Sequence, residues 1–452
     1  MFKTLKNAWK TPELQKKMLF TLFIVLLYRL GATICVPYVD SGIADSFSAA
    51  YGDSVIGMLS VLSGGAMANA TLFALSVSPY ITASIVMQLL TVAIPPLERM
   101  AKDGAEGQKK INMITRIVTV ALALITSYGY SMMLKSGYQG ASMLVRDDWF
   151  AMLVINASFC AGASLVMWLA ELINDKGIGN GISMILFANI IAGIPGAIKN
   201  LWTVLVINTG MHWAIGAVIM LGVAAIMVAL VGFVVWVTNS ERRIPIQYAK
   251  RVVGRKMYGG QSTNLPIKLN MSGVMPIIFA NSIVMIPSTI VAFIVAGNEK
   301  AATENWFCRF VTQFFGTTTW EYLVVFLVLI VAFSYFYIMI SFNPVEVANN
   351  INSNGGAIPG HRPGRPTVQY INRILKRITL IGAFFLCIVA GLPMLVTVIT
   401  SALANAGVSV PSGLGALTFG GSSLLIVVGV ILETVRDLEA QLSLRASKGF
   451  LN

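Results

Sequence analysis

The segment PYITASIVMQLLTVAIPP, which runs from Pro79 to Pro96, is an apolar run closed by prolines at both ends. A helix needs about 20 mostly apolar residues to cross a bilayer, so this segment is close to one span in length. Similar runs recur along the whole chain. The ten expected spans are 18–37, 74–94, 113–134, 151–173, 181–207, 214–237, 273–296, 321–342, 378–403 and 418–436. The sequence therefore predicts an all-α polytopic membrane protein.

The overall composition agrees with this class. Of the 452 residues, 56% are hydrophobic and 11% are charged, whereas a soluble domain carries about 25% charged residues. This balance argues against a water-soluble multidomain enzyme, a disordered chain and a disulfide scaffold. The four cysteines form no Cys-X-X-Cys pair, and the only histidines are His212 and His361. We therefore expect no metal site and no cofactor.

The basic residues indicate the orientation in the membrane. An even number of spans places both termini on one side. The segments on that side contain 24 of the 32 Lys and Arg residues; they are 1–17, 95–112, 174–180, 238–272, 343–377 and 437–452. Positively charged segments remain in the cytoplasm, so both termini are expected to be cytoplasmic.

The ten spans divide into two sets of five. The expected units are an N-terminal segment (1–17), a first half (18–207), a hinge (208–213), a second half (214–436) and a C-terminal tail (437–452). Because five is odd, the second half must enter the membrane in the orientation opposite to that of the first. An odd number of spans in each half is compatible with an inverted repeat, in which the functional path lies between the two halves.

The external stretch between the first two spans is unusual. Its apolar pieces, 56–62 and 66–75, are too short to cross a bilayer, and Gly64-Gly65 interrupts them. Irregular backbone at membrane depth is tolerated only inside protein or beside a water-filled cavity. These residues alone are compatible with two interpretations, a folded external loop and a re-entrant plug near 57–72.

No catalytic pattern accompanies the spans. The nearest approach to a phosphate-binding loop, 104–109, lacks the required Gly-Lys-Ser/Thr ending. The expected spans hold no paired carboxylates at membrane depth for acid–base chemistry. Their charged residues, Arg29, Glu171, Glu433 and Arg436 among them, are better explained by pairing between helices than by a proton relay. We therefore expect no enzymatic activity, and any driving energy must come from a partner.

Two spans combine apolar and polar faces. In span two, Ile81 and Ile85 are four residues apart and share one helical face, while Ser84 and Gln88 share another. The isoleucine pair could face lipid, but an amide at position 88 needs a polar partner or water.

Span seven carries Pro276 and Pro287 together with Asn281 and Ser282. Two prolines favour a bent, adjustable helix. A seam between span two and span seven would be weaker than one between aliphatic helices, although the polar groups could also satisfy one another.

The two long cytoplasmic segments are strongly basic. Segment 238–272 has a net charge of +6 and segment 343–377 a net charge of +4. The residues singled out are Arg242, Arg243, Lys250, Arg251, Arg255 and Lys256 in the first segment and Arg362 and Arg365 in the second. Such segments suit RNA phosphate or an acidic protein face, or they are solvated loops near anionic lipid.

At several of these places the sequence resembles the SecY/Sec61-alpha family of protein-conducting channels. The stretches that carry the resemblance are YRLGATICVP (28–37), PYITASIVMQLL (79–90), GAEGQKKIN (104–112), MWLAELINDKGIGNGIS (167–183), ERRIPIQYAKR (241–251), IPGHRPG (358–364) and FGGSSLLIVVGV (419–430). They occur in order across the ten expected spans, from Trp9 to about Leu451.

The resemblance implies a clamshell of two five-helix halves around an hourglass pore. The implied pore ring is Ile81, Ile85, Leu186, Ile190, Met275, Ile278 and Ile426. A narrow apolar ring dewets and blocks ions, yet yields to a passing chain. The implied plug includes Met58, Leu59, Leu62, Gly64 and Gly65, which favours the re-entrant interpretation. The implied lateral gate lies between spans two and seven and includes Ser84, Gln88, Asn281 and Ser282.

The resemblance also implies partners and a location. The basic segments would dock the ribosome with its RNA and the SecA motor ATPase, and small SecE-like and SecG-like membrane subunits would accompany the chain. Substrates would be unfolded secretory and membrane proteins, moved across or released into the bilayer of the bacterial cytoplasmic membrane. The chain departs from the usual family pattern at Leu186, Met275, His361 and Arg365-Pro366.

Two other functions are compatible with parts of the sequence. An accessory SecY-type channel for few substrates would have weaker cytoplasmic loops than these. A secondary transporter of a small solute would fit the composition and the inverted halves, but it predicts a cation-coordinating group at the midplane, and the expected spans offer no candidate.

Overall fold

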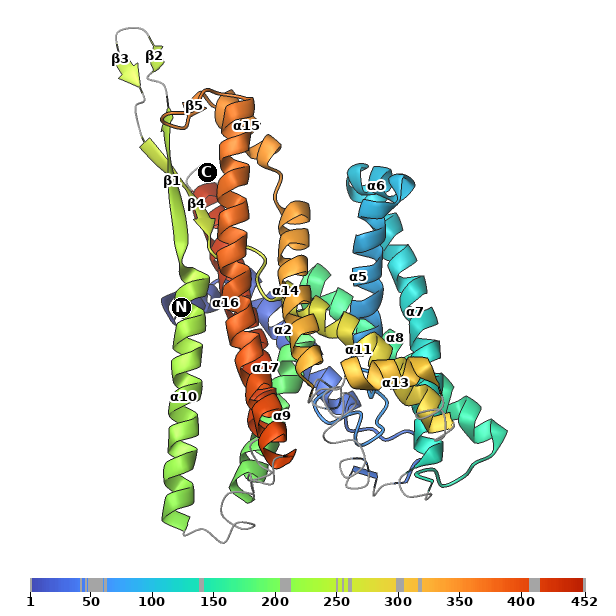
Figure 1. The fold of residues 1–452 in the computed structure, drawn as a ribbon. Coiled ribbons are helices and arrows are strands. Elements are labelled where there is room, and N and C mark those ends of the chain that lie inside the picture. Colours follow the sequence, from blue (N-terminus) through green and yellow to red (C-terminus); the bar gives the residue numbers. More distant parts are fainter. Residues whose placement is uncertain are drawn as a thin grey trace.

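The computed structural model consists mainly of helices (Figure 1). It describes residues 2–40, 43–44, 47, 60, 63–137, 142–203, 213–248, 251–253, 256–258, 262–297, 305–315, 319–405 and 415–449. The helices before residue 208 are α1 (Phe2–Lys10), α2 (Pro12–Gly31), α5 (Ser78–Ala93), α6 (Pro95–Lys102), α7 (Ala105–Ser136), α8 (Trp149–Lys176) and α9 (Gly181–Trp202). Those after it are α10 (Trp213–Asn239), α11 (Met275–Gly297), α13 (Trp306–Phe314), α14 (Trp320–Ser341), α15 (Pro344–Ser353), α16 (Arg365–Asn405) and α17 (Gly415–Gly449).

Each of the ten expected apolar runs overlaps one of these helices. Within the described residues, five helices are long and apolar enough to cross a membrane: Ala105–Ser136, Trp149–Lys176, Gly216–Asn239, Trp320–Ser353 and Arg365–Leu392. The pair α5 and α6 makes a sixth if it is one span. Gly181–Gly196 and Met275–Val291 are shorter apolar helices. The count of ten spans therefore stays a prediction.

Prolines determine how the opening segment folds. The residue before a proline is pushed out of the helical region, and Ile94, before Pro95, is extended with φ −108° and ψ 113°. Pro95 can begin the next helix because the first turn needs no N–H from it. The chain consequently bends by 101° between α5 and α6.

The membrane helices pack into a closed circuit. Following the contacts, α2 packs on α8, α8 on α7, α7 on α5, and α5 on α11. The circuit continues from α11 to α14, α16, α17 and α9, and α9 returns to α2. The two halves of the chain meet at two seams, where α11 contacts α5 and α7, and where α17 contacts α9. α10 packs on α17 at the outside (Figure 1).

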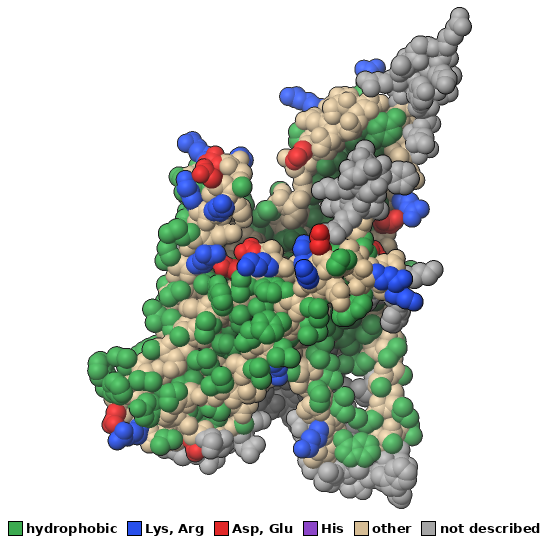
Figure 2. Space-filling view, turned by 180° about the vertical axis from the view of Figure 1, so that it is seen from behind, with side chains coloured by type: hydrophobic (Ala, Val, Ile, Leu, Met, Phe, Trp, Pro, Cys, Tyr) green, Lys and Arg blue, Asp and Glu red, His purple; other side chains and the backbone are tan. Residues whose placement is uncertain are grey.

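The surface is divided into bands. Figure 2 shows hydrophobic side chains across the middle of the molecule, and Lys, Arg, Asp and Glu side chains gathered toward the end that carries α6 and α15. The surface is hollowed at that end, between the tip of α6 and the neighbouring lobe. An apolar band with a basic end is what a bilayer and the positive-inside rule require.

The prediction of an all-α fold was wrong for segment 238–272. Strand β1 (Glu241–Tyr248) pairs antiparallel with β4 (Ser262–Lys268), and β1 also pairs with the short β5 (Gly356–Ala357). At the tip, β2 (Arg251–Val253) pairs with β3 (Lys256–Tyr258). The physical reason is the alternation in β1, where Ile244 and Ile246 are buried and their neighbours are exposed.

Two expected boundaries also move. The loop predicted at 343–377 consists of α15, β5, a turn and the beginning of α16, which starts at Arg365. The tail predicted from residue 437 continues α17 as far as Gly449. The predicted ends of spans therefore do not coincide with the ends of helices, because a helix can continue into water when it packs on a neighbour.

Candidate functional site

The predicted pore-ring residues come from four helices of the circuit. Six of the seven are buried members of one apolar cluster, with exposed fractions of 2–6%: Ile81 and Ile85 on α5, Leu186 and Ile190 on α9, Ile278 on α11 and Ile426 on α17. Met275 at the start of α11 packs against the same cluster. All four helices take part in the two seams between the halves, and α7 also contacts α11 at one of them. The apolar cluster therefore reaches both seams.

The described part of the predicted plug packs against this region. Gly64 and Gly65 have φ of +66° and +83°, a conformation that glycine adopts without strain. A Cβ on Gly64 would lie 2.7 Å from Nη1 of Arg29 and 3.1 Å from the backbone of Asn189. Gly64 thus sits between α2 and α9. Met58, Leu59 and Leu62 of the predicted plug lie outside the described residues.

A buried polar network fixes the end of this segment. Nδ2 of Asn189 donates to Oγ of Ser76 at 3.1 Å, and the hydroxyls of Ser76 and Tyr28 are 3.2 Å apart. Nη1 of Arg29 donates to Oδ1 of Asn189 at 3.4 Å. Ser76 is held at φ +49°, an uncommon value for a residue other than glycine. Asn189 precedes Ile190, so the network joins a residue of the predicted ring to Ser76, which follows the predicted plug, and to Arg29, which lies beside Gly64.

This network was not predicted from the sequence. Its signal was present in the motif YRLG, where a tyrosine and an arginine occur inside an apolar run. Both need polar partners when they are buried. Only the fold could identify those partners, because Tyr28 and Asn189 are 161 residues apart in the chain.

The predicted gate residues mostly bond within their own helices. Nε2 of Gln88 lies 3.5 Å from Oγ of Ser84 on α5, and Oγ of Ser282 donates to the carbonyl of Ile278 on α11 at 2.9 Å. Asn281 is buried, and its Oδ1 accepts no hydrogen bond from the described residues. Among the described residues, α11 therefore carries a buried acceptor that is not used.

One of the two prolines of α11 has no effect on its hydrogen bonds. Pro276 lies in the first turn of the helix, where no internal N–H is required. Pro287 lies inside the helix and removes one bond. A bend in α11 is therefore expected at Pro287 alone.

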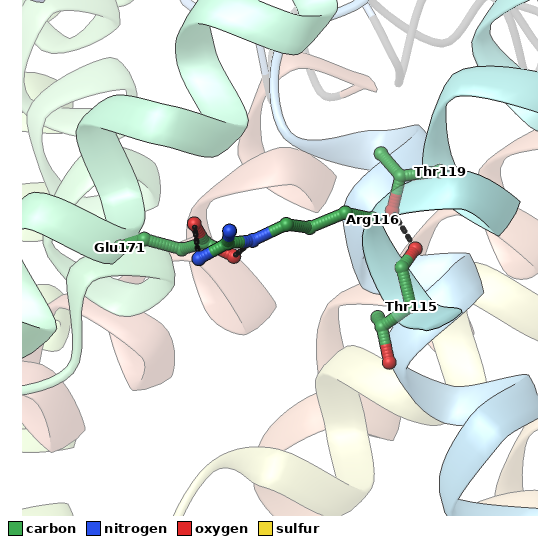
Figure 3. A network of polar contacts seen from close by, with 4 residues as sticks. All are labelled: Thr115, Arg116, Thr119 and Glu171. Atoms are coloured by element: carbon green, nitrogen blue, oxygen red, sulfur yellow. Dashed lines mark hydrogen bonds and ion pairs between the residues drawn. The ribbon is translucent and has the colours of Figure 1, made fainter. Parts of the chain in front are cut away.

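Of the charged residues expected to pair between helices, Glu171 and Arg436 contact a neighbouring helix. Arg116 of α7 meets Glu171 of α8 through two parallel contacts of 2.9 and 2.8 Å (Figure 3). In the same picture, Oγ1 of Thr119 donates to the carbonyl of Thr115 one turn before it. Nη2 of Arg436 donates to the carbonyl of Thr238 at 2.7 Å, which fastens α17 to α10. These contacts join neighbouring helices to one another.

The two basic segments form one structural unit, which we call the docking unit (residues 241–268 and 344–378). Its core joins Ile244 and Ile246 of β1, Ile267 of β4, Ile351 of α15 and Ile371 of α16. Burial lowers the pKa of Lys268 on β4, and the charge of the nearby Arg436 lowers it further. The segments predicted to share a partner are thus held together by an apolar core.

The basic side chains of the docking unit point into solvent where they are described. Arg242, Arg243, Arg362 and Arg365 are exposed, and Nη2 of Arg243 lies 3.0 Å from Oε1 of Glu241. Arg251 and Lys256 belong to β2 and β3 at the tip, whereas Lys250 and Arg255 lie outside the described residues.

His361, one of the departures from the family pattern, packs against an aromatic side chain of the docking unit. Its ring lies 4.1 Å from the ring of Tyr370, centroid to centroid. Oγ1 of Thr367 donates to the carbonyl of Arg362 at 2.8 Å. The turn before α16 is therefore held by the ring contact of His361 and by the hydrogen bond to the carbonyl of Arg362.

Comparison with known proteins identifies the family. A family model described as SecY matches residues 71–435. The chain belongs to the SecY family. Protein translocase subunit SecY of Streptomyces griseus is 44% identical over the full length of both chains. The subunit of Streptomyces coelicolor is 42% identical over the full length of both, and that of Mycobacterium tuberculosis is 40% identical over 98% of each.

Solved structures of the SecY fold agree with the packing described above. One described as "The structure of a protein conducting channel" has a TM-score of 0.62 at 16% identity and covers 94% of this chain and 92% of its own. Sec61 in the canine ribosome-channel complex has a TM-score of 0.56 at 14% identity, with the same coverage. The chain is a multi-pass membrane protein with a mostly helical SecY fold.

Proposed function

We propose that the chain is a protein-conducting channel that moves unfolded polypeptides across the membrane and releases apolar segments sideways into lipid. The observation that carries the proposal is the apolar cluster at both seams of a closed helix circuit. A ring of this kind excludes water and ions at rest and yields to a threaded chain without binding it. Membership in the SecY family supports the same function.

The proposal also includes the arrangement of the spans, the constriction, the plug and the gate. Ten spans form two inverted halves, 18–207 and 214–436, joined by a hinge at 208–213. The seven ring residues line the constriction, and the segment near 57–72 plugs it. Contact between α5 and α11 forms the lateral gate, and the unused acceptor of Asn281 supports a seam that can separate.

The energy and the partners come from outside the chain. The docking unit binds a translating ribosome or the SecA motor ATPase, and small SecE-like and SecG-like subunits brace the channel. Its exposed arginines suit phosphate and carboxylate groups because their guanidinium groups form paired hydrogen bonds. A solved relative, canine Sec61, was observed in a ribosome-channel complex. Both termini and the docking unit face the cytoplasm, and the membrane is the bacterial cytoplasmic membrane.

Reconstitution tests the proposal directly. Vesicles that contain the purified chain, a SecE-like subunit and SecA should protect an added unfolded preprotein from external protease only when ATP is present. The control is the same preparation without SecA. Saturable uptake of a small solute by the chain alone, with no protected preprotein, would instead support a secondary transporter.

Charge reversal in the docking unit should weaken partner binding. Arg243→Glu and Arg362→Glu should each lower the affinity for SecA or the ribosome by about tenfold, because each removes a charged hydrogen bond donor. Binding to reconstituted vesicles, measured by flotation, provides the test.

The matched control is Glu241→Gln. It breaks the same exposed ion pair as Arg243→Glu, but it keeps the positive charge, and an exposed pair contributes little stability. Partner affinity should therefore stay close to that of the native chain. Equal affinity in all three variants would show that the arginines make no contact with the partner.

A further inference from the structure

A short amphipathic helix on the side of the molecule away from the docking unit has no role in the proposed channel. α13 lies across α11 in Figure 1. Its inner face carries Cys308 and Val311, which pack with Phe315 against Val291 of α11. Oγ of Ser288 on α11 donates to the carbonyl of Phe315 at 3.3 Å. α13 is therefore fastened to a helix of the proposed gate.

The outer face of α13 is a ridge of stacked rings. Trp306, Phe310 and Phe314 are spaced four residues apart, so they lie along one side of the helix. Their ring centroids are 5.8 and 4.5 Å apart along the ridge. All three rings are exposed, with Trp306 78% exposed. Three stacked rings are an apolar surface that is unfavourable in water and indicates a covering partner.

The surroundings of α13 indicate which partner covers the ridge. α13 contacts α11 and α14, and both helices expose apolar side chains, among them Ile290 of α11 and Val328 of α14. The helices on which α13 packs thus also present apolar side chains at the surface, where acyl chains of a bilayer would cover them. Tryptophans are also exposed at the first residues of α8 and α14, Trp149 and Trp320. Rings of this kind gather where a membrane meets water.

We propose that α13 is an interfacial helix whose aromatic ridge enters the phospholipid leaflet on the side away from the docking unit. Amphipathic helices lie in the interface with their apolar face at the boundary of headgroups and acyl chains. Since the opposite face is fixed to α11, this leaflet holds the outer part of α11 at a set depth. The lipid contact does not depend on transport, so it can be tested independently of channel function.

Photo-crosslinking locates the ridge. The full chain, reconstituted in vesicles of phosphatidylethanolamine and phosphatidylglycerol, carries p-benzoylphenylalanine in place of Phe310. The controls replace Val328, which is exposed on α14, and Phe326, which is fully buried in α14. Phospholipid adducts, measured by intact mass, should form at position 310 nearly as well as at 328 and far better than at 326. No lipid adduct at position 310, or an adduct with protein alone, would overturn the proposal.

Cys308 reports whether the ridge holds α13 in place. It is buried on the inner face of α13, and its reaction with a membrane-impermeant maleimide can be timed in a Cys35→Ser background. Phe310→Ser with Phe314→Ser should speed that reaction by about tenfold, because two rings no longer partition into lipid. Phe310→Leu with Phe314→Leu keeps an apolar ridge and should leave the rate near its original value. Equal rates in both double variants would overturn the proposal.

Discussion

Replacing Ile85 and Ile190 with serine should open the resting channel to ions. Both side chains are buried in the apolar cluster at the seams between the halves. Burial of one isoleucine contributes about 1.5–3 kcal/mol, and polar hydroxyls in its place favour water in the constriction. The resting ion flux through vesicles should rise by about one to two orders of magnitude, since each 1.4 kcal/mol corresponds to a factor of ten. A dye-dissipation assay on reconstituted vesicles measures it.

The matched control places serine on the lipid side of the same protein. Ile125 of α7 is exposed outside the cluster, so Ile125→Ser changes the same chemical groups away from the proposed constriction. Its vesicles should remain as tight as those of the native chain. If the ring variant assembles normally and its ion flux and translocation are both unchanged, these isoleucines do not form the seal.

Gly64→Ala should also unseal the channel, but through the plug. The backbone at Gly64 is left-handed, which raises the energy of any other residue by about 1–2 kcal/mol. The new methyl group would also press on Nη1 of Arg29 and on the backbone of Asn189. A long arginine side chain can move, whereas the α9 backbone at Asn189 cannot move without disturbing Ile190. The expected result is a plug segment that leaves its place in a larger fraction of channels.

The neighbouring glycine separates the contact from the backbone effect. Gly65 also has a left-handed φ, but among the described residues a Cβ there would have only Nδ2 of Asn69 within 4 Å, at 3.9 Å. Gly65→Ala should therefore show the backbone effect alone. The ion leak of Gly64→Ala should exceed it by about tenfold, which corresponds to a modest steric overlap in a packed site. Equal leaks in the two variants would mean that the contact of Gly64 with α2 and α9 does not hold the plug.

Two features of the docking unit show where pattern and fold diverge. Segment 238–272 lies between two apolar runs and is predicted as a cytoplasmic loop, yet the alternation of Ile244 and Ile246 is typical of a strand. Its pairing with β5, which lies beyond two further membrane helices in the sequence, could not be predicted from local pattern. Strand partners that are distant in the chain are chosen by the packing of the helices that carry them.

The candidate site, too, could be predicted from the sequence only in part. The spacing of Ile81 and Ile85 placed both on one face of a helix, and the family resemblance pointed to the other ring residues. That six of the seven are buried in one cluster is a result of tertiary packing. The sequence pattern could not reveal that Asn189 bonds to Ser76 and Arg29. An amide in an apolar run must have polar partners when it is buried, but the pattern does not show which residues these are.

Taken alone, the order of apolar runs and basic segments determined the membrane class, the helical character and the places of the apolar helices, because hydration energy acts on each residue wherever it lies. Only the tertiary structure decided that the helices close into a circuit, that Gly64 rests between α2 and α9, and that the two basic segments share a core. These contacts join residues far apart in the chain, and their energies depend on distances of a few ångströms that no linear pattern contains.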